Sequence, residues 1–288
     1  MKFCLGTVQL GLKYGINNQI KRQPTKNEGY EILQTAYEAG IKYLDTASAY
    51  GTAEELIGES GILDNGTVHV ITKPDARKHS GLADEVKKSL EKLKQEYIDG
   101  LLLHDAPNYY DKQQMSELLE IKENGLAMHI GVSVYEPKDA VRIAADGVVD
   151  YIQIPYSVFD QRLDHTDFFQ MVKKNKIKVF ARSCFLQGLI LMEPNVIPRH
   201  LKEAEAYVER YRSILRTYEF SVAEAAMLFS YTHPDIYKVV FGVDTAEQLK
   251  TNLAVAKKAE QFPKCRQALA GITDGISEHI LNPGLWEV

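Results

Sequence analysis

The sequence contains few cysteines. Its three, Cys4, Cys184 and Cys265, are an odd number at wide spacing, and no CxxC pair occurs. A disulfide framework or a zinc knuckle needs paired or closely spaced cysteines. The pattern therefore argues against both, and we expect the chain to fold in a reducing compartment.

Long apolar runs are also missing. No run approaches the roughly 20 residues that a membrane helix needs. The first residues, MKFCLGTVQLGLKYG, reach polar side chains and glycine too early for a signal-peptide core. We therefore expect no membrane partner and a cytoplasmic location.

Positive charge is not in excess. The 34 Lys and Arg residues stand against 39 Asp and Glu residues, for a formal net charge of −5. Because no basic stripe is available to displace counterions, we do not expect nucleic acid as a partner. The 45% hydrophobic and 25% charged content is typical of a globular protein.

Eight short apolar runs alternate with longer amphipathic stretches over the 288 residues. Most are continuously apolar, as in strands that are buried on both faces of a parallel sheet. The predicted strands are Phe3–Thr7, Lys42–Asp45, Val68–Lys73, Gly100–His104, Ile130–Val134, Tyr151–Pro155, Lys178–Ser183 and Lys238–Val243. This alternation predicts an α/β fold, a (β/α)8 TIM barrel that forms one domain over residues 1–288.

The intervening stretches carry helix signals. Thr25 and Glu28 have the spacing of a capping box at the start of a helix that ends before Gly40. Further helices are predicted at Leu82–Leu93, Met115–Glu123, Lys138–Ala145, Thr166–Lys174, Leu201–Arg216, Ser221–Ser230 and Ala246–Ala259. A doubly wound open sheet is the alternative, but it usually has a Gly-rich turn after its first strand. No GxGxxG occurs there, so the barrel is favoured.

Chemically active side chains follow consecutive predicted strands. Asp45 ends the second, Lys73 the third and His104 the fourth, while Tyr50 lies in the loop after Asp45. In a barrel these positions surround one mouth. A buried Lys73 needs a counter-charge that Asp45 supplies, and a tyrosine beside the lysine has its phenolate favoured, which lowers its pKa.

This set of side chains suits the reduction of a carbonyl group. His104 orients the carbonyl oxygen while Tyr50 protonates it and a hydride reaches the carbon. None of these residues supplies a hydride, so a nicotinamide cofactor is required.

At these residues the sequence resembles the aldo-keto reductase superfamily, nearly from end to end. The matching motifs are Leu5-Gly6-Thr7-Val8-Gln9-Leu10-Gly11, Leu44-Asp45-Thr46-Ala47-Ser48-Ala49-Tyr50-Gly51, Thr72-Lys73, Leu103-His104, Gly131-Val132-Ser133, Gln153-Ile154-Pro155-Tyr156-Ser157 and Gly242-Val243 to Asn252-Leu253. The resemblance implies a catalytic tetrad of Asp45, Tyr50, Lys73 and His104. In it Tyr50 donates the proton, Lys73 lowers the pKa of Tyr50, Asp45 holds Lys73 and His104 orients the carbonyl.

The resemblance also implies NADPH, or sometimes NADH, bound over the barrel mouth without a Rossmann motif. The residues that it assigns to this cofactor are Ser133 and Gln153 at the nicotinamide amide, Ser183 and Gly188 at the pyrophosphate, and Gly242, Val243, Asp244, Gln248 and Asn252 after the last strand. Arg182 stands where many members stack a tyrosine on the nicotinamide, and we expect it to be paired or to serve the substrate or the pyrophosphate. Members that prefer NADPH commonly have Lys and Arg in place of Gly242 and Gln248. The sequence therefore does not decide between NADPH and NADH as the cofactor.

The expected substrate is a small carbonyl compound, with a sugar derivative as one option, and we expect it to contact Tyr14, Tyr156 and Trp286. The predicted function is therefore an NAD(P)H-dependent reductase of an aldehyde or ketone. The alternative is a nucleotide-binding regulatory or sensing subunit with the same barrel and little turnover. A metal-dependent hydrolase is disfavoured, and no metal is expected, because His129, His165, His200 and His233 lack ligand spacing. The sequence gives no prediction of oligomeric state.

Overall fold

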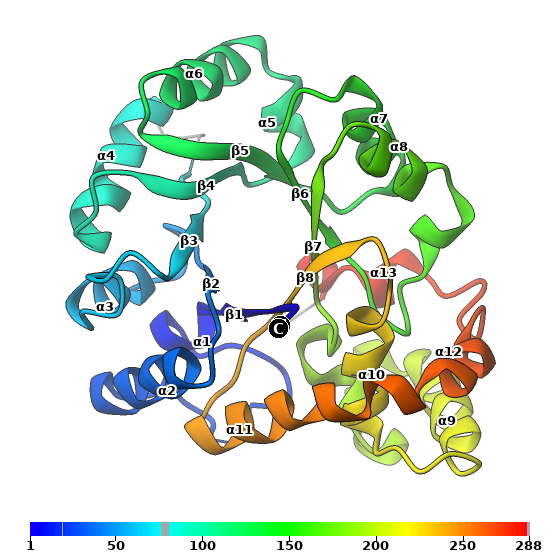
Figure 1. The fold of residues 1–288 in the computed structure, drawn as a ribbon. Coiled ribbons are helices and arrows are strands. Elements are labelled where there is room, and N and C mark those ends of the chain that lie inside the picture. The colour runs from blue at the N-terminus through cyan, green and yellow to red at the C-terminus, as the bar shows by residue number, and fades with distance from the viewer. Residues whose placement is uncertain (19, 76–80, 287–288) are drawn as a thin grey trace.

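Eight parallel strands close into a barrel in chain order (Figure 1). The computed structural model describes residues 1–18, 20–75 and 81–286. The strands are β1 (Phe3–Gly6), β2 (Tyr43–Asp45), β3 (His69–Thr72), β4 (Ile98–Leu103), β5 (Ala127–Ser133), β6 (Tyr151–Pro155), β7 (Lys178–Arg182) and β8 (Ile236–Phe241). All eight predicted strands are confirmed, and so is the (β/α)8 fold class; the bounds differ most at the starts of β4 and β5 and at both ends of β8.

The register of the parallel pairs brings the strand ends to one level. Gly6 pairs with Asp45 across β1 and β2, and Pro155 pairs with Arg182 across β6 and β7. At the same end Ser133 pairs with Gln153. Because parallel strands share a direction, side chains at their carboxyl ends surround one opening.

Side chains fill the barrel interior below that opening. A buried cluster combines large and small residues from seven strands: Cys4, Tyr43, Ile71, Leu102, Tyr151, Phe180 and Val240. Alternating strands supply such layers, so the interior is a packed core and not a channel. All three cysteines are buried and free.

Helices surround the barrel (Figure 1). They are α1 (Val8–Gly11), α2 (Lys26–Glu38), α3 (Ala53–Glu59), α4 (Leu82–Leu93), α5 (Ala106–Tyr110), α6 (Lys112–Glu123), α7 (Pro137–Asp146), α8 (Phe168–Lys174), α9 (Ala204–Leu215), α10 (Val222–Tyr231), α11 (Ala246–Ala254), α12 (Pro263–Leu269) and α13 (Glu278–Leu281). The capping box of Thr25 and Glu28 is confirmed. The predicted long helix over Ala246–Ala259 is wrong in its second half, where a 3-10 segment, Val255–Gln261, follows α11.

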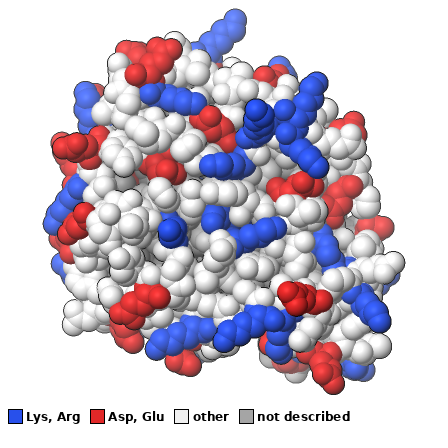
Figure 2. All heavy atoms as spheres, in the orientation of Figure 1, with Lys and Arg blue, Asp and Glu red and all other residues white. Residues whose placement is uncertain are grey.

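The surface carries both signs of charge. Figure 2 shows acidic and basic side chains interspersed over the face in view, in keeping with the small net charge of −5. Over the residues that the structure describes, no helix is long and apolar enough to cross a membrane.

Candidate active site

A cavity of about 360 Å³ opens at the carboxyl ends of the strands. Fifteen of the residues expected at the site line it: Tyr14, Asp45, Tyr50, Lys73, His104, Ser133, Gln153, Arg182, Ser183, Gly188, Gly242, Val243, Asp244, Gln248 and Asn252. They come from all eight strands or the loops that follow them. Barrel closure therefore collects in one place the residues that the sequence spreads over most of its length.

At the floor of the cavity a buried ion pair joins β2 to the end of β3. Lys73 Nζ lies 2.7 Å from Asp45 Oδ1, and both side chains are almost completely buried. Gln153 Nε2 donates to the same carboxylate oxygen at 2.6 Å. The predicted pairing of Lys73 with Asp45 is thus present, because adjacent parallel strands place the two ends side by side.

Tyr50 reaches the cavity from the loop after β2, where two glycines allow the backbone to pack closely. A Cβ at Gly11 would lie 1.7 Å from the carbonyl oxygen of Tyr50, and one at Gly51 would lie 2.3 Å from the carbonyl oxygen of Gly11. Gly51 also has a φ of +57°, which favours glycine. The loop that carries Tyr50 is therefore held against α1 by contacts that larger residues would prevent.

The sequence predicts that Lys73 lowers the pKa of Tyr50, whereas the net shift of that pKa in the structure is upward. Burial raises the pKa of Tyr50, and the negative charge of Asp45 raises it further. The cation that lowers it is Arg182. Lys73 Nζ lies 5.5 Å from the centre of the Tyr50 ring and is paired with Asp45.

The loop after β7 forms a wall of the cavity in an uncommon backbone conformation. Ser183, Leu186 and Gln187 have φ angles of 64°, 47° and 52°, although none is glycine. Left-handed residues of this kind cost free energy, and they concentrate at functional sites. The segment after β1 packs on this loop, since Ile16 N donates to Gln187 O at 3.2 Å and a Cβ at Gly188 would meet Asn17.

Arg182 lies in the cavity wall at the end of β7. Its Nε donates to Ser133 Oγ at 3.4 Å, and its two terminal nitrogens donate to Ser183 Oγ at 3.3 Å and Val134 O at 3.2 Å. The guanidinium stacks on Tyr135, 3.9 Å from the ring centre. Arg182 therefore joins β7 to the end of β5.

The corner between β8 and α11 is tied together by its own polar groups. Gln248 Oε1 accepts from Asp244 N at 2.7 Å, and Asn18 Nδ2 donates to Asp244 Oδ1 at 3.2 Å. Burial raises the pKa of Asp244. Thr245 caps α11 by accepting from Gln248 N.

Gln9 lies next to this corner, and no role for it was predicted from the sequence. A Cβ at Gly242 would lie 2.0 Å from Gln9 Oε1. That oxygen is buried and has no hydrogen-bond partner among the described residues. Other cavity residues that were missed are Thr7, Asn17, Asn18, Tyr135, Phe185, Gln187 and Pro283. For all of these except Pro283, which follows α13, the position after β1, β5 or β7 was the available signal.

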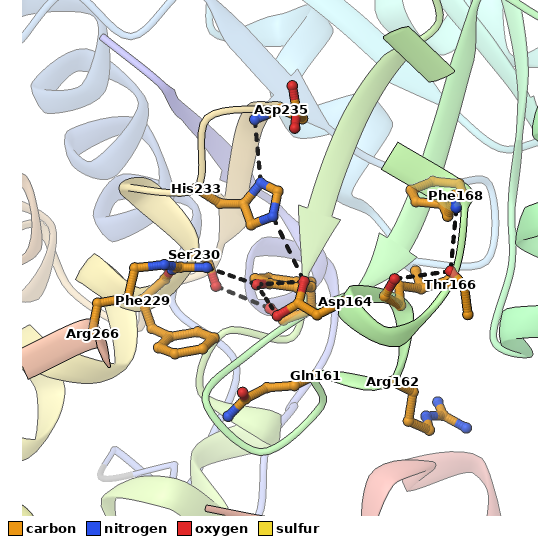
Figure 3. Close-up of polar contacts among 12 residues, drawn as sticks. Gln161, Arg162, Asp164, Thr166, Phe168, Phe229, Ser230, His233, Asp235 and Arg266 are labelled. Carbon is orange, nitrogen blue, oxygen red and sulfur yellow. Dashed lines mark hydrogen bonds and ion pairs between the residues drawn. The ribbon is translucent and has the colours of Figure 1, made fainter. Parts of the chain in front are cut away.

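Two expected substrate residues, Tyr156 and Trp286, are not among the residues that line the cavity. Tyr156 is completely buried, and its hydroxyl donates to Asp164 and accepts from Arg266 at 2.9 Å. Figure 3 shows Asp164 within this network, which also includes His233. Trp286 donates its indole N–H to His279 O at 2.8 Å. Both side chains pack into the protein, which is the physical reason why the structure places neither at the mouth.

Comparisons with known proteins agree with this architecture. The model of the Aldo/keto reductase family matches residues 2–270. The chain is 26% identical over 255 residues to the uncharacterized oxidoreductase YqkF of Bacillus subtilis, over 80% of this chain and 83% of that protein. It is 25% identical over 284 residues to L-galactose dehydrogenase of Arabidopsis thaliana, over 90% and 85%.

Among solved structures, the fold is similar to that of the aldo-keto reductase AKR11C1 from Bacillus halodurans in its holo form. The TM-score is 0.75, the sequences are 20% identical, and the match covers 98% of this chain and 95% of that one. At this identity the likeness concerns the fold.

Proposed function

Because the chain belongs to the aldo/keto reductase family, we propose that it reduces an aldehyde or ketone with a hydride from NADH or NADPH and a proton from Tyr50. The observation that carries this proposal is the buried pair of Lys73 and Asp45 at 2.7 Å in a cavity that Tyr50 and His104 also line. The four side chains are those that the resemblance assigns to catalysis.

Each of the four side chains has its own role in the proposed reaction. His104 hydrogen-bonds the carbonyl oxygen and holds it toward the Tyr50 hydroxyl. A reduced nicotinamide held in the cavity would supply the hydride that the carbonyl carbon accepts. Tyr50 then protonates the oxygen, which is possible even with a raised pKa because an alkoxide is a much stronger base than a phenolate. Lys73, held by Asp45, places positive charge beside the developing phenolate.

The cavity has groups that fit a nicotinamide dinucleotide. Gln9 Oε1 is a buried acceptor without a partner in the described residues, so a ligand that offers an N–H or O–H group there would satisfy it. Ser133, Gln153, Ser183 and Gly188 would hold the nicotinamide and pyrophosphate, and Gln248 and Asn252 the adenosine.

Of the two nucleotides, we propose that NADH binds more tightly. The space beside Gly242, where NADPH-preferring members have a lysine, is filled by Gln9. Asp244 adds a carboxylate to the same corner, and the cations Lys73 and Arg182 that line the cavity lie on other strands. A 2′-phosphate at this corner would therefore meet negative charge and few donors.

The substrate is proposed to be a carbonyl compound derived from a sugar. Its support is the similarity to a plant L-galactose dehydrogenase over most of both chains, together with a cavity whose lining includes many hydrogen-bonding side chains. Hydroxyl-rich ligands need such groups.

Calorimetric titration of the purified protein with NADH and NADPH tests the proposal. We expect NADH to bind about tenfold more tightly than NADPH, and Asp244→Asn to narrow that difference. Binding of neither nucleotide would contradict the reductase assignment. Tight binding without turnover of any carbonyl compound would favour the regulatory-subunit alternative.

A further inference from the structure

Among the described residues, Arg182 is hydrogen-bonded to neutral groups. Its hydrogen bonds go to Ser133 Oγ, Ser183 Oγ and Val134 O, which are neutral acceptors, at 3.2–3.4 Å. These distances exceed the usual N–H···O length of about 2.9 Å. None of the carboxylates in the described part of the chain forms an ion pair with it. Lys73, by contrast, is paired with Asp45.

The guanidinium also has N–H donors that these contacts do not use. It has five N–H groups in a planar fork, and the three contacts above use only three of them. Tyr135 covers one face at 3.9 Å, which fixes the orientation of the plane. An oriented guanidinium with unused donors is suited to binding a carboxylate or phosphate group.

The position of Arg182 is on the side of the cavity where the reaction is proposed to occur. β7 lies between β6 and β8, and the Arg182 side chain reaches past β6 to Ser133 and Val134 at the end of β5, away from the β8–α11 corner. Its charge acts on both Tyr50 and Tyr14, lowering the pKa of each against the larger effect of burial. Arg182 and Tyr50, the proposed proton donor, line the same cavity.

Building on the proposed reductase function, we propose that Arg182 binds an anionic group of the substrate. The preferred substrates are then aldehydes or ketones that carry a carboxylate or a phosphate near the carbonyl. The other source of an anion is the pyrophosphate of the cofactor, which the contacts of Arg182 with β5 disfavour.

Matched substrates that differ in charge test this assignment. The first pair is 4-formylbenzoate and its methyl ester, and the second is glyceraldehyde 3-phosphate and glyceraldehyde. For the wild type we expect kcat/KM to be at least about tenfold higher for the anionic member of one pair than for its neutral member, because the neutral compound cannot form the charge-assisted contact with Arg182. A preference within the first pair indicates that Arg182 binds a carboxylate, and one within the second pair indicates that it binds a phosphate.

Variants assign that preference to Arg182. Arg182→Gln should bring the ratio of kcat/KM for the anionic substrate to kcat/KM for the neutral one close to one, mainly by raising KM for the anionic substrate. Arg182→Lys should keep part of the preference. Arg142→Gln is the matched control, because Arg142 also stacks on a tyrosine, Tyr110 at 4.7 Å, but lies exposed on α7. It should leave the ratio unchanged.

Two results would overturn the assignment. One is a wild-type ratio near one for both pairs. The other is an Arg182→Gln enzyme that keeps the wild-type ratio but binds NADH more weakly, which would place the cofactor pyrophosphate at Arg182. If the wild type turns over no member of either pair, substrate binding replaces turnover as the measurement. Calorimetry with 4-formylbenzoate and glyceraldehyde 3-phosphate in the presence of NADH then tests the anion site. Binding of either compound to the wild type but not to Arg182→Gln supports the assignment of Arg182. Any other result contradicts that assignment.

Discussion

Asp45 Oδ1 accepts hydrogen bonds from Lys73 Nζ at 2.7 Å and from Gln153 Nε2 at 2.6 Å. One oxygen thus joins β2 to the ends of β3 and β6 beneath the cavity. A buried charge is tolerated only when it is paired and hydrogen-bonded. At the scale of single residues, this shared oxygen holds the cation that the proposed chemistry needs.

Replacing Asp45 by Asn should therefore lower both stability and turnover. The substitution leaves Lys73 buried without its counter-charge, for which about 3–5 kcal/mol is the usual cost. Urea unfolding measures the change. The double variant Asp45→Asn/Lys73→Met removes both charges and should recover part of the lost stability, although not the activity. A single variant as stable as the wild type would contradict this account of the pair.

The turn after β1 and the loop after β2 act as one element. Gly11→Ala would place a methyl group 1.7 Å from the Tyr50 carbonyl oxygen and 2.7 Å from Ala53 N, so the backbone that carries Tyr50 must move. A displacement of about 1 Å at a catalytic group costs on the order of a hundredfold in rate. We expect kcat/KM to fall by that order.

Gly29→Ala in α2 is the control for this change, because its new methyl group meets only the flexible end of Leu56. It should keep nearly all of the activity. Wild-type activity in Gly11→Ala would show that the close packing of the two loops does not position Tyr50.

The segment after β6 is fixed by the network that joins Tyr156 to Asp164 and Arg266; Figure 3 shows the last two side chains. Tyr156→Phe removes the hydroxyl that donates to Asp164 and accepts from Arg266, so that Asp164 keeps only His233 and Arg266 only Phe229 O in this network. A hydrogen bond to a charged group contributes about 1.5–3 kcal/mol. Thermal unfolding should show this loss. In Tyr110→Phe, which removes an exposed hydroxyl bonded to Asp139, the change should stay within about 0.5 kcal/mol. Equal effects in the two variants would argue against a special role of the buried network.

Elements with a strong local signal were predictable from the sequence, whereas the directions of side chains just beyond them were not. The strands follow from continuous apolar runs, and α2 follows from its capping box. Tyr156 follows a strand end too, but its backbone N–H bonds to Arg182 O and its ring turns outward to Phe169 and Phe229. No periodicity encodes that turn.

At the scale of the whole molecule, closure of the barrel makes the site. Asp45, Lys73 and His104 were predicted together because consecutive strand ends must meet around one opening. The setting of Arg182 was not predictable, because its partners Ser133, Val134 and Tyr135 follow a strand distant in sequence. Nor was the rise in the pKa of Tyr50, since burial depends on how the loops pack.

The most direct test of the central claim is the rate at which protein-bound NADH is oxidised after rapid mixing with a carbonyl substrate, for the wild type and for Tyr50→Phe. We expect the variant to react about 10²–10⁴-fold more slowly, the usual contribution of a positioned general acid, while its calorimetric affinity for NADH stays within about threefold. A Tyr50→Phe protein that oxidises NADH at the wild-type rate would contradict the assignment of Tyr50 as the proton donor.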